Sequence, residues 1–151
     1  MSTSDHIFLR TGLGVSEVAR GLAEALGGQV VENADGAFVS RPTTSTDGGE
    51  VGGEVRPNSF VVPAEPEPDE LSVLDNYDTI FEVRATSGDQ TLEAGRVFTE
   101  IVEWSAWPAL LVHNLDTLVS AWNPSAGRTD FPGGTTPDAV DRALWQPYEL
   151  S

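Results

Sequence analysis

The 151-residue sequence contains no cysteine, no lysine and only two histidines. Without cysteine the chain forms no disulfide, no thiolate metal site and no cysteine nucleophile. No apolar run approaches the roughly 18 residues of a membrane-spanning helix. The segment MSTSDHIFLR has neither the basic start nor the apolar stretch of a signal peptide. We therefore expect a cytoplasmic protein that does not enter the membrane.

Acidic side chains outnumber basic ones by 24 to 8, and the formal net charge is −16. A GC-rich genome, which favours arginine codons, or a salt-adapted proteome would each give such a composition without any functional role. If neither accounts for it, a field this negative repels nucleic acids and anionic membranes and attracts basic partners. The charge therefore argues against direct nucleic-acid binding and favours a basic protein partner.

Two parts of the chain show the same order of a strand, a helix and a hairpin. Residues 6–41 contain an alternating strand, a helical apolar stripe with Ser16 as N-cap, and an Asp-Gly hairpin signal. Residues 78–122 repeat the order, with Asp89 as N-cap of the helix. Its buried stripe comprises Ala94, Val97, Phe98, Ile101 and Val102, and an exposed charge ladder comprises Glu93, Arg96 and Glu100.

The two hairpins also share a sequence pattern, VVENADGAFVS at 30–40 and LVHNLDTLVS at 111–120. We interpret this as a tandem β-α-β-β duplication with Asn33 and Asn114 at equivalent turns, although short apolar strings also resemble one another by chance. Two such units predict an α+β fold with a mainly antiparallel sheet and two helices on one face. A ligand cleft between the halves is one consequence of this arrangement.

The remaining segments predict connections within a single domain spanning residues 1–151. Residues 42–58 are rich in glycine and read as a loop, and a short strand follows at SFVV (59–62). Alternating proline and acid indicate an extended loop at 63–70. The tail, residues 123–151, carries large apolar side chains. We expect it to wrap over the core with a helical turn near 138–145, where Thr136 is the expected N-cap and Pro137 the first helical residue.

No motif predicts catalysis or a cofactor. Gly12-x-Gly14 lies between a strand and a helix, but Glu17 stands where a dinucleotide-binding loop has its third glycine. We expect His113 to be a partly buried, hydrogen-bonded histidine and not a catalytic group. Carboxylate pairs such as Asp138 and Asp141 are expected by chance in so acidic a chain. We therefore expect no catalytic residue, no cofactor and no enzymatic activity.

A metal site is not expected either. The acids of the glycine-rich loop, Asp47, Glu50 and Glu54, lack the order of an EF-hand. The mixed charges of the tail are expected to tie it to the body through arginine–carboxylate hydrogen bonds. They are Arg128, Asp130, Asp141 and Arg142.

At the level of class, the chain resembles the small acidic immunity proteins that neutralise bacterial polymorphic toxins. The features that carry the resemblance are the length, the charge, the segment EPEPDE (65–70) and the lack of catalytic groups. The resemblance implies a stoichiometric inhibitor of a basic toxin domain and carries over no site residues. Our candidate partner-binding residues are the acids of this segment and its neighbourhood, Glu65, Glu67, Asp69, Glu70, Asp75 and Asp78.

Two other functions use the same features. The repeated strand-helix-hairpin order is also similar to effector-binding domains of bacterial regulators, in which an acidic cleft takes a cationic small molecule. Tryptophans would then supply aromatic walls and cation–π contacts, and the candidates are Trp104, Trp107, Trp122 and Trp145. A DNA-mimic protein, with carboxylates at phosphate-like spacing, is a further alternative.

Overall fold

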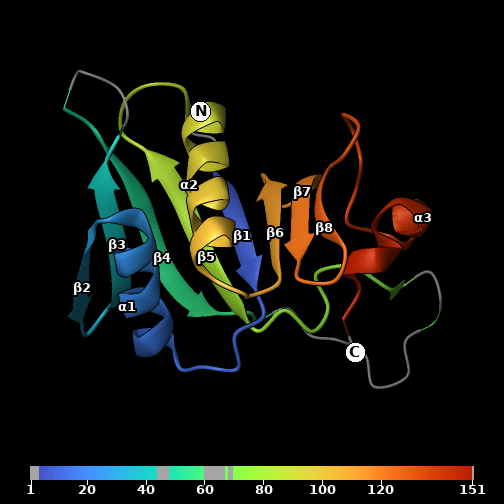
Figure 1. Ribbon diagram of the computed structural model, residues 1–151, viewed down its shortest axis with the longest axis horizontal. Coiled ribbons are helices and arrows are strands. Elements are labelled where there is room, and N and C mark those ends of the chain that lie inside the picture. Colours follow the sequence, from blue (N-terminus) through green and yellow to red (C-terminus); the bar gives the residue numbers. More distant parts are fainter. Residues whose placement is uncertain (1–3, 44–47, 60–66, 68–69, 151) are drawn as a thin grey trace.

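The computed structural model describes residues 4–43, 48–59, 67 and 70–150, and it confirms an α+β fold with a mainly antiparallel sheet (Figure 1). Eight strands form one sheet in the order β2-β3-β4-β5-β1-β6-β7-β8, and every neighbouring pair is antiparallel. The strands are β1 (Asp5–Leu9), β2 (Gln29–Asn33), β3 (Gly36–Pro42), β4 (Glu50–Pro57), β5 (Thr79–Ala85), β6 (Ala109–His113), β7 (Thr117–Asn123) and β8 (Gly127–Asp130).

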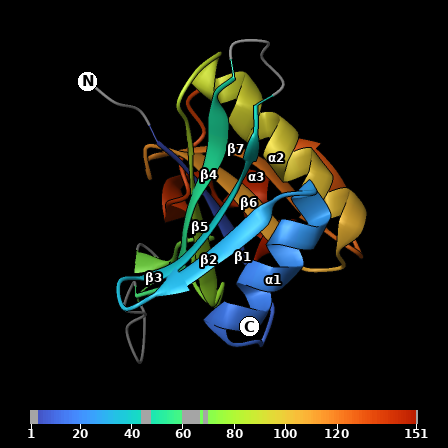
Figure 2. The same ribbon diagram turned by 90° about the vertical axis from the view of Figure 1, so that its left-hand side faces the viewer.

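Two helices, α1 (Val15–Leu26) and α2 (Gln90–Trp104), pack on one face of the sheet (Figure 2). The Asp89 side chain caps α2 by accepting from the Leu92 amide at 3.0 Å, as predicted. The N-cap of α1 is Gly14 and not Ser16, because the helix already begins at Val15. Val97, Phe98 and Ile101 of α2 are fully buried against the sheet.

The polar side of α2 differs from the expected exposed charge ladder. Glu93 is 2% exposed, so it belongs to the buried surface of the helix. Glu100 forms an ion pair with Arg41, a buried arginine on β3. The prediction of an exposed residue was therefore wrong at Glu93, whereas Glu100 stays partly exposed. The pairing of Glu100 with an arginine of β3 could not be seen from spacing along one helix.

The tail covers the opposite face of the sheet. Its residues form β8, a turn of 3-10 helix (Ala139–Asp141), α3 (Arg142–Trp145) and a final 3-10 turn (Gln146–Tyr148). The first turn starts after Asp138, so Thr136 is not its N-cap. Trp145 and Tyr148 are buried there, and the Tyr77 hydroxyl donates to the Tyr148 carbonyl at 2.8 Å. A second core therefore lies under the tail, built from the alternate residues of β1 and β6 such as Phe8 and Leu110.

The glycine-rich segment at 42–58 is not all loop, because residues 50–57 form β4 between β3 and β5. A Cβ atom on Gly52 would lie 2.0 Å from the Val39 carbonyl oxygen, and one on Gly53 would lie 2.2 Å from that of Glu82. These glycines are therefore required by the close approach of the neighbouring strands. The same composition is typical of a loop, which is why the sequence misled. The expected strand at 59–62 lies outside the described residues, apart from Ser59.

The structure does not confirm the duplication. Both segments contain a strand, a helix and a hairpin, but β2–β3 forms one edge of the sheet whereas β6–β7 lies directly beside β1. The turns differ as well. Asn33 is the last residue of β2 and pairs with Gly36, whereas Asn114 is a turn residue with a φ of 51°. The similar strings encode hairpins of different geometry.

The helix layer is narrower than the sheet. α1 packs mainly against β2, β3 and β4 and against α2, whereas α2 packs mainly against β5, β1 and β6. In the described part of the chain no helix lies over β7 and β8 on this face, as Figure 1 shows to the right of α2. The helix-side face of these last two strands is therefore not covered by a helix of the described chain.

Candidate functional site

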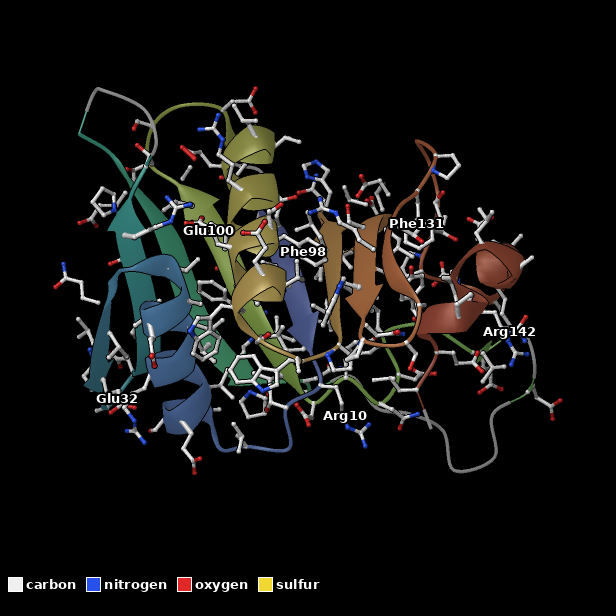
Figure 3. All side chains as sticks on the ribbon, in the orientation of Figure 1. Arg10, Glu32, Phe98, Glu100, Phe131 and Arg142 are labelled. Atoms are coloured by element: carbon white, nitrogen blue, oxygen red, sulfur yellow. The ribbon has the colours of Figure 1, made fainter. Side chains whose placement is uncertain are left out.

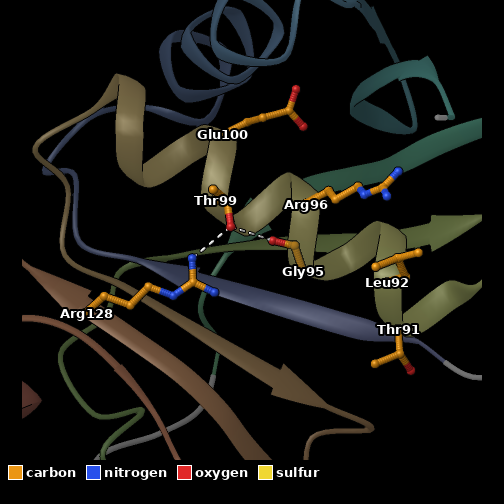
Figure 4. Close-up of a pocket in the computed structure, with 7 residues that line it drawn as sticks. All are labelled: Thr91, Leu92, Gly95, Arg96, Thr99, Glu100 and Arg128. Atoms are coloured by element: carbon orange, nitrogen blue, oxygen red, sulfur yellow. Dashed lines mark hydrogen bonds between the residues drawn. The ribbon is translucent and has the colours of Figure 1, made fainter.

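A groove runs between α2 and the strands β6–β8 on the helix side of the sheet, and we call it the α2–β8 groove. It consists of two adjoining cavities of about 550 Å³ and about 400 Å³, which share Thr91, Gly95 and Arg128. The larger cavity is completed by Leu92, Arg96, Thr99 and Glu100 (Figure 4). The smaller one is completed by Asp5, Leu111, His113, Thr117, Val119, Ser120, Asp130 and Phe131.

One wall of the groove is a flank of α2 with small side chains. Thr91, Gly95 and Thr99 recur every four residues and therefore lie on one face of the helix. A Cβ atom built on Gly95 meets no atom of another described residue outside its helix within 4 Å, whereas one on Gly21 of α1 would lie 2.9 Å from the Trp107 ring. Internal packing therefore accounts for the glycine in α1 but not for the glycine in α2.

The floor of the groove is shaped by a β-bulge in β7. Leu111 pairs with Ser120 and Val112 pairs with Leu118, so that Val119 is an extra residue in the ladder. A bulge changes the direction of side chains along its strand. As a result the adjacent residues Val119 and Ser120 both line the groove, while Leu118 is buried under the tail. No turn residue in the sequence signals this bulge, and we did not predict it.

Arg128 of β8 reaches across the groove to α2. Its guanidinium donates to the Thr99 hydroxyl at 2.8 Å and to the Asp130 carboxylate at 3.1 Å. It also lies 5.2 Å from the centre of the Phe98 ring. Hydrogen bonds from the Ser120 hydroxyl and from Arg128 hold the pKa of Asp130 below its ordinary value. Arg128 therefore joins the end of the chain to α2 through the Thr99 hydroxyl, and not through a carboxylate of the body as expected.

A polar cluster closes the other end of the groove. Asp5 is 2% exposed and accepts from Gln90 at 2.8 Å, and one of its oxygens lies 2.9 Å from the His113 Nδ1 atom. The Nε2 atom of His113 lies 3.3 Å from the amide of Asn114. His113 is therefore a partly buried, hydrogen-bonded histidine, as predicted. The Ser120 hydroxyl donates to the Asp130 carboxylate at 2.7 Å.

The predicted acidic residues that the structure describes, Glu67, Glu70, Asp75 and Asp78, do not line this groove. Glu67 and Glu70 are exposed, and Glu65 and Asp69 lie outside the described residues. The chain that follows runs on the tail side of the sheet, where Val73 donates to the Pro137 carbonyl. Among the described residues of this segment, Glu67 and Glu70 are exposed and are not part of the groove lining.

The two remaining candidates have roles inside the molecule. The Asp78 carboxylate accepts from the amides of Thr11 at 3.1 Å and Gly12 at 2.9 Å, and Asp75 accepts from the Ser72 amide. Burial raises the pKa of Asp78, but the backbone hydrogen bonds outweigh this effect and the pKa falls below its ordinary value. Asp78 thereby holds the glycine turn that leads into α1.

The four tryptophans do not form one aromatic wall. Trp104 and Trp107 make an edge-to-face pair with ring centres 5.7 Å apart, beside Gly21. Trp122 packs against the helix-side core, and Trp145 is fully buried on the opposite face. The cation–π site expected for an effector-binding domain is therefore not assembled by these side chains.

The arginine–carboxylate pairs of the tail lie within the tail, and not between the tail and the body as expected. Arg142 donates two hydrogen bonds to the Glu149 carboxylate at 2.8 and 2.9 Å, and Asp141 accepts from Thr136. Figure 3 shows Arg142 at the end of the molecule that carries α3, away from Glu100 and α2.

Within residues 4–43, 48–59, 67 and 70–150, no group of three or more histidine and acidic side chains is placed to hold a metal ion. In the same residues, no helix has the length and apolar character needed to cross a membrane. No family model, no curated protein and no solved structure matches this chain.

Proposed function

We propose that this chain is a non-catalytic, acidic binding protein that holds a segment of a basic protein partner in the α2–β8 groove. The observation that carries the proposal is the groove itself, an open stretch of sheet face beside a helix whose wall lacks a side chain at Gly95. Apolar surface from Leu92, Val119 and Phe131 supplies the contact area, and hydroxyl and carboxylate groups supply specific hydrogen bonds.

The charge of the molecule supports a basic partner. Inside the groove the charges are largely paired, Asp130 with Arg128 and Glu100 with Arg41. Most of the surplus of −16 therefore lies on the rest of the surface. Such a field accelerates the approach of a cationic protein and repels nucleic acid. In this proposal the negative surface outside the groove attracts the partner, and the groove then binds it specifically.

The specific form of this function that we propose is stoichiometric neutralisation of a basic toxin domain. The resemblance to small acidic immunity proteins supports it, together with the length and charge of the chain. An inhibitor of this kind needs only a binding surface, and the polar groups of the groove are held in place by hydrogen bonds to one another.

A peptide-display selection from random sequences of about 16 residues tests the proposal, because it selects ligands without the natural partner being identified first. We expect enrichment of peptides rich in lysine or arginine that bind one per chain and remain intact. Gly95→Gln, which fills the groove, should weaken a selected peptide by about tenfold or more. Arg20→Gln, at an exposed position on α1, is the matched control and should change the affinity less than about twofold. Selected peptides that are indifferent to Gly95→Gln would contradict the proposed site.

The size of the cavities supports one alternative, a small cationic ligand. Volumes of about 400 Å³ and about 550 Å³ lie in the range of small-molecule sites, roughly 300–1,000 Å³. If the chain is an effector-binding domain, a cationic amine should raise its thermal unfolding temperature. Gly95→Gln should abolish this rise. The same screen would then yield no peptide that competes with the amine.

A further inference from the structure

The sheet is wider than the helix layer on it by about one helix. Eight strands spaced about 4.8 Å apart make a sheet roughly 34 Å across. Two helices at the usual packing distance cover roughly 20 Å of that width. Because α1 and α2 lie toward the β2 side, the uncovered width falls over β7 and β8, where the α2–β8 groove lies.

We infer that the partner segment held in this groove is an amphipathic α-helix that lies beside α2 and completes the helix layer. This inference rests on the proposed function and names the structure of the segment. The floor of the groove is β7, and its backbone is already paired with β6 on one side and β8 on the other. An extended segment on this face would have no strand to pair with, whereas a helix satisfies its own backbone hydrogen bonds.

The glycine in α2 supports close packing of a helix against this wall. A glycine inside a helix weakens it, and sequences accept that cost where another group must approach the backbone closely. Gly21 shows this inside the molecule, because the rings of Trp107 and Trp104 occupy the space beside it. No atom of another described residue outside the helix lies within 4 Å of a Cβ atom built on Gly95. A side chain of the docked helix would fill it as Trp107 does at Gly21.

The surfaces around the groove specify the chemistry of this helix. Its apolar side would contact Leu92, which is 52% exposed, and the partly buried Val119 and Phe131. Its outer side should carry lysine or arginine, since the chain as a whole is strongly negative. The Arg128 bridge to Thr99, drawn in Figure 4, forms part of the surface on which this helix rests.

Three synthetic peptides of about 18 residues, equivalent to five helical turns, test the inference. The first contains leucine and lysine at helical spacing. The second has the same composition in strict alternation, the pattern of a strand. The third replaces the lysines of the first with glutamate. Binding is measured by fluorescence anisotropy, and helix formation by the change in circular dichroism on mixing.

We expect the first peptide to bind and to become more helical, and the other two to bind at least about tenfold more weakly. Gly95→Gln should reduce its affinity by about tenfold and Gly95→Ala by less, while Arg20→Gln should leave it unchanged. The open space at Gly95 means that both variants are expected to fold.

The outcomes separate the inference from the proposed function. If the alternating peptide binds as well as the first, and Gly95→Gln weakens both, the groove binds basic segments but does not select a helix. If Gly95→Gln leaves the binding of the first peptide unchanged, both the groove and the helix are overturned. If the first peptide does not bind at all, a basic amphipathic helix is not the occupant.

Discussion

Phe98 joins the core of the molecule to the candidate site at the scale of a single residue. Its ring is fully buried among the helix-side core residues, and Arg128 lies over it from the groove. Phe98→Ala should lower the free energy of unfolding by about 3–5 kcal/mol, the usual range for deleting a large aromatic side chain from a core. Chemical denaturation measures this. Leu92→Ala, at an exposed site on the same helix, should change it by less than about 1 kcal/mol.

Asp78 makes a pH-dependent contribution to stability. Its pKa in the folded chain is below the ordinary carboxyl value, because the amides of Gly12 and Thr11 donate to the carboxylate. A lowered pKa means that the stabilisation is complete above about pH 4, the ordinary range, and is lost as the pH falls through the folded value. Asp78→Ala should therefore destabilise the chain at pH 7 and matter progressively less on acidification. Urea denaturation at several pH values measures the difference, and a constant difference would contradict this role.

Predictions about single residues were confirmed where neighbouring residues in the sequence determine the surroundings of the side chain. The burial of Phe98 and the hydrogen-bonded state of His113 both follow from their places in periodic segments. The roles of Asp78 and Glu100 could not be read in this way. The Asp78 carboxylate holds the turn at Thr11, and Glu100 of α2 pairs with Arg41 of β3. These contacts join residues far apart in the chain, and neighbouring sequence does not encode them.

The two helix-interior glycines allow a prediction at the scale of elements. Alanine at Gly95 has a higher helix propensity than glycine, and its Cβ atom would have no atom of another described residue outside the helix within 4 Å. Gly95→Ala should therefore raise the free energy of unfolding by about 0.5–1 kcal/mol. Alanine at Gly21 would collide with Trp107 at 2.9 Å, and overpacking of this kind costs about 1–3 kcal/mol. Gly21→Ala should therefore be destabilising. Thermal unfolding of the two variants should shift the midpoint in opposite directions, and a destabilising Gly95→Ala would mean that the space at Gly95 is filled.

Elements were predictable from sequence where their periodicity was complete. The helix over 90–104 and the hairpin at 109–123 follow from apolar spacing, a cap and turn residues. Strand β4 could not be predicted, because Gly52 and Gly53 give it the composition of a loop. The reason for these glycines is the closeness of Val39 and Glu82 on the neighbouring strands, and this appears only once the sheet is assembled.

The α2–β8 groove arises from the whole molecule and has no sequence motif. It exists because the two helices pack toward one side of the sheet and the tail covers the other face. Its residues come from β1, α2, β6, β7 and β8 and from Phe131 just after β8, and each of them is ordinary within its own part of the chain. The glycine at 95, inside a helical pattern, is the sequence feature that fits our proposal that a group approaches α2 from outside.

The net charge leads to a last prediction, which concerns rates. If the surface charge steers a basic partner, the association rate constant should fall steeply with salt, because the screening length is about 10 Å at 0.1 M. Neutralising Glu65, Glu67, Asp69 and Glu70 together should slow association of the helical leucine–lysine peptide and leave its dissociation rate nearly unchanged. Gly95→Gln should do the reverse, because contacts in the groove act after encounter. Stopped-flow fluorescence resolves the two rate constants.

The control for this prediction is an equal number of exposed acids elsewhere, Glu24, Glu32, Asp35 and Glu103. Neutralising them removes the same net charge from α1, β2, its turn and the end of α2. A larger effect on association from the 65–70 segment than from this set would identify the segment as the place where the partner is first attracted. Equal and small effects would instead assign the acidity to the general composition of the proteome, and recognition would then depend on the groove alone.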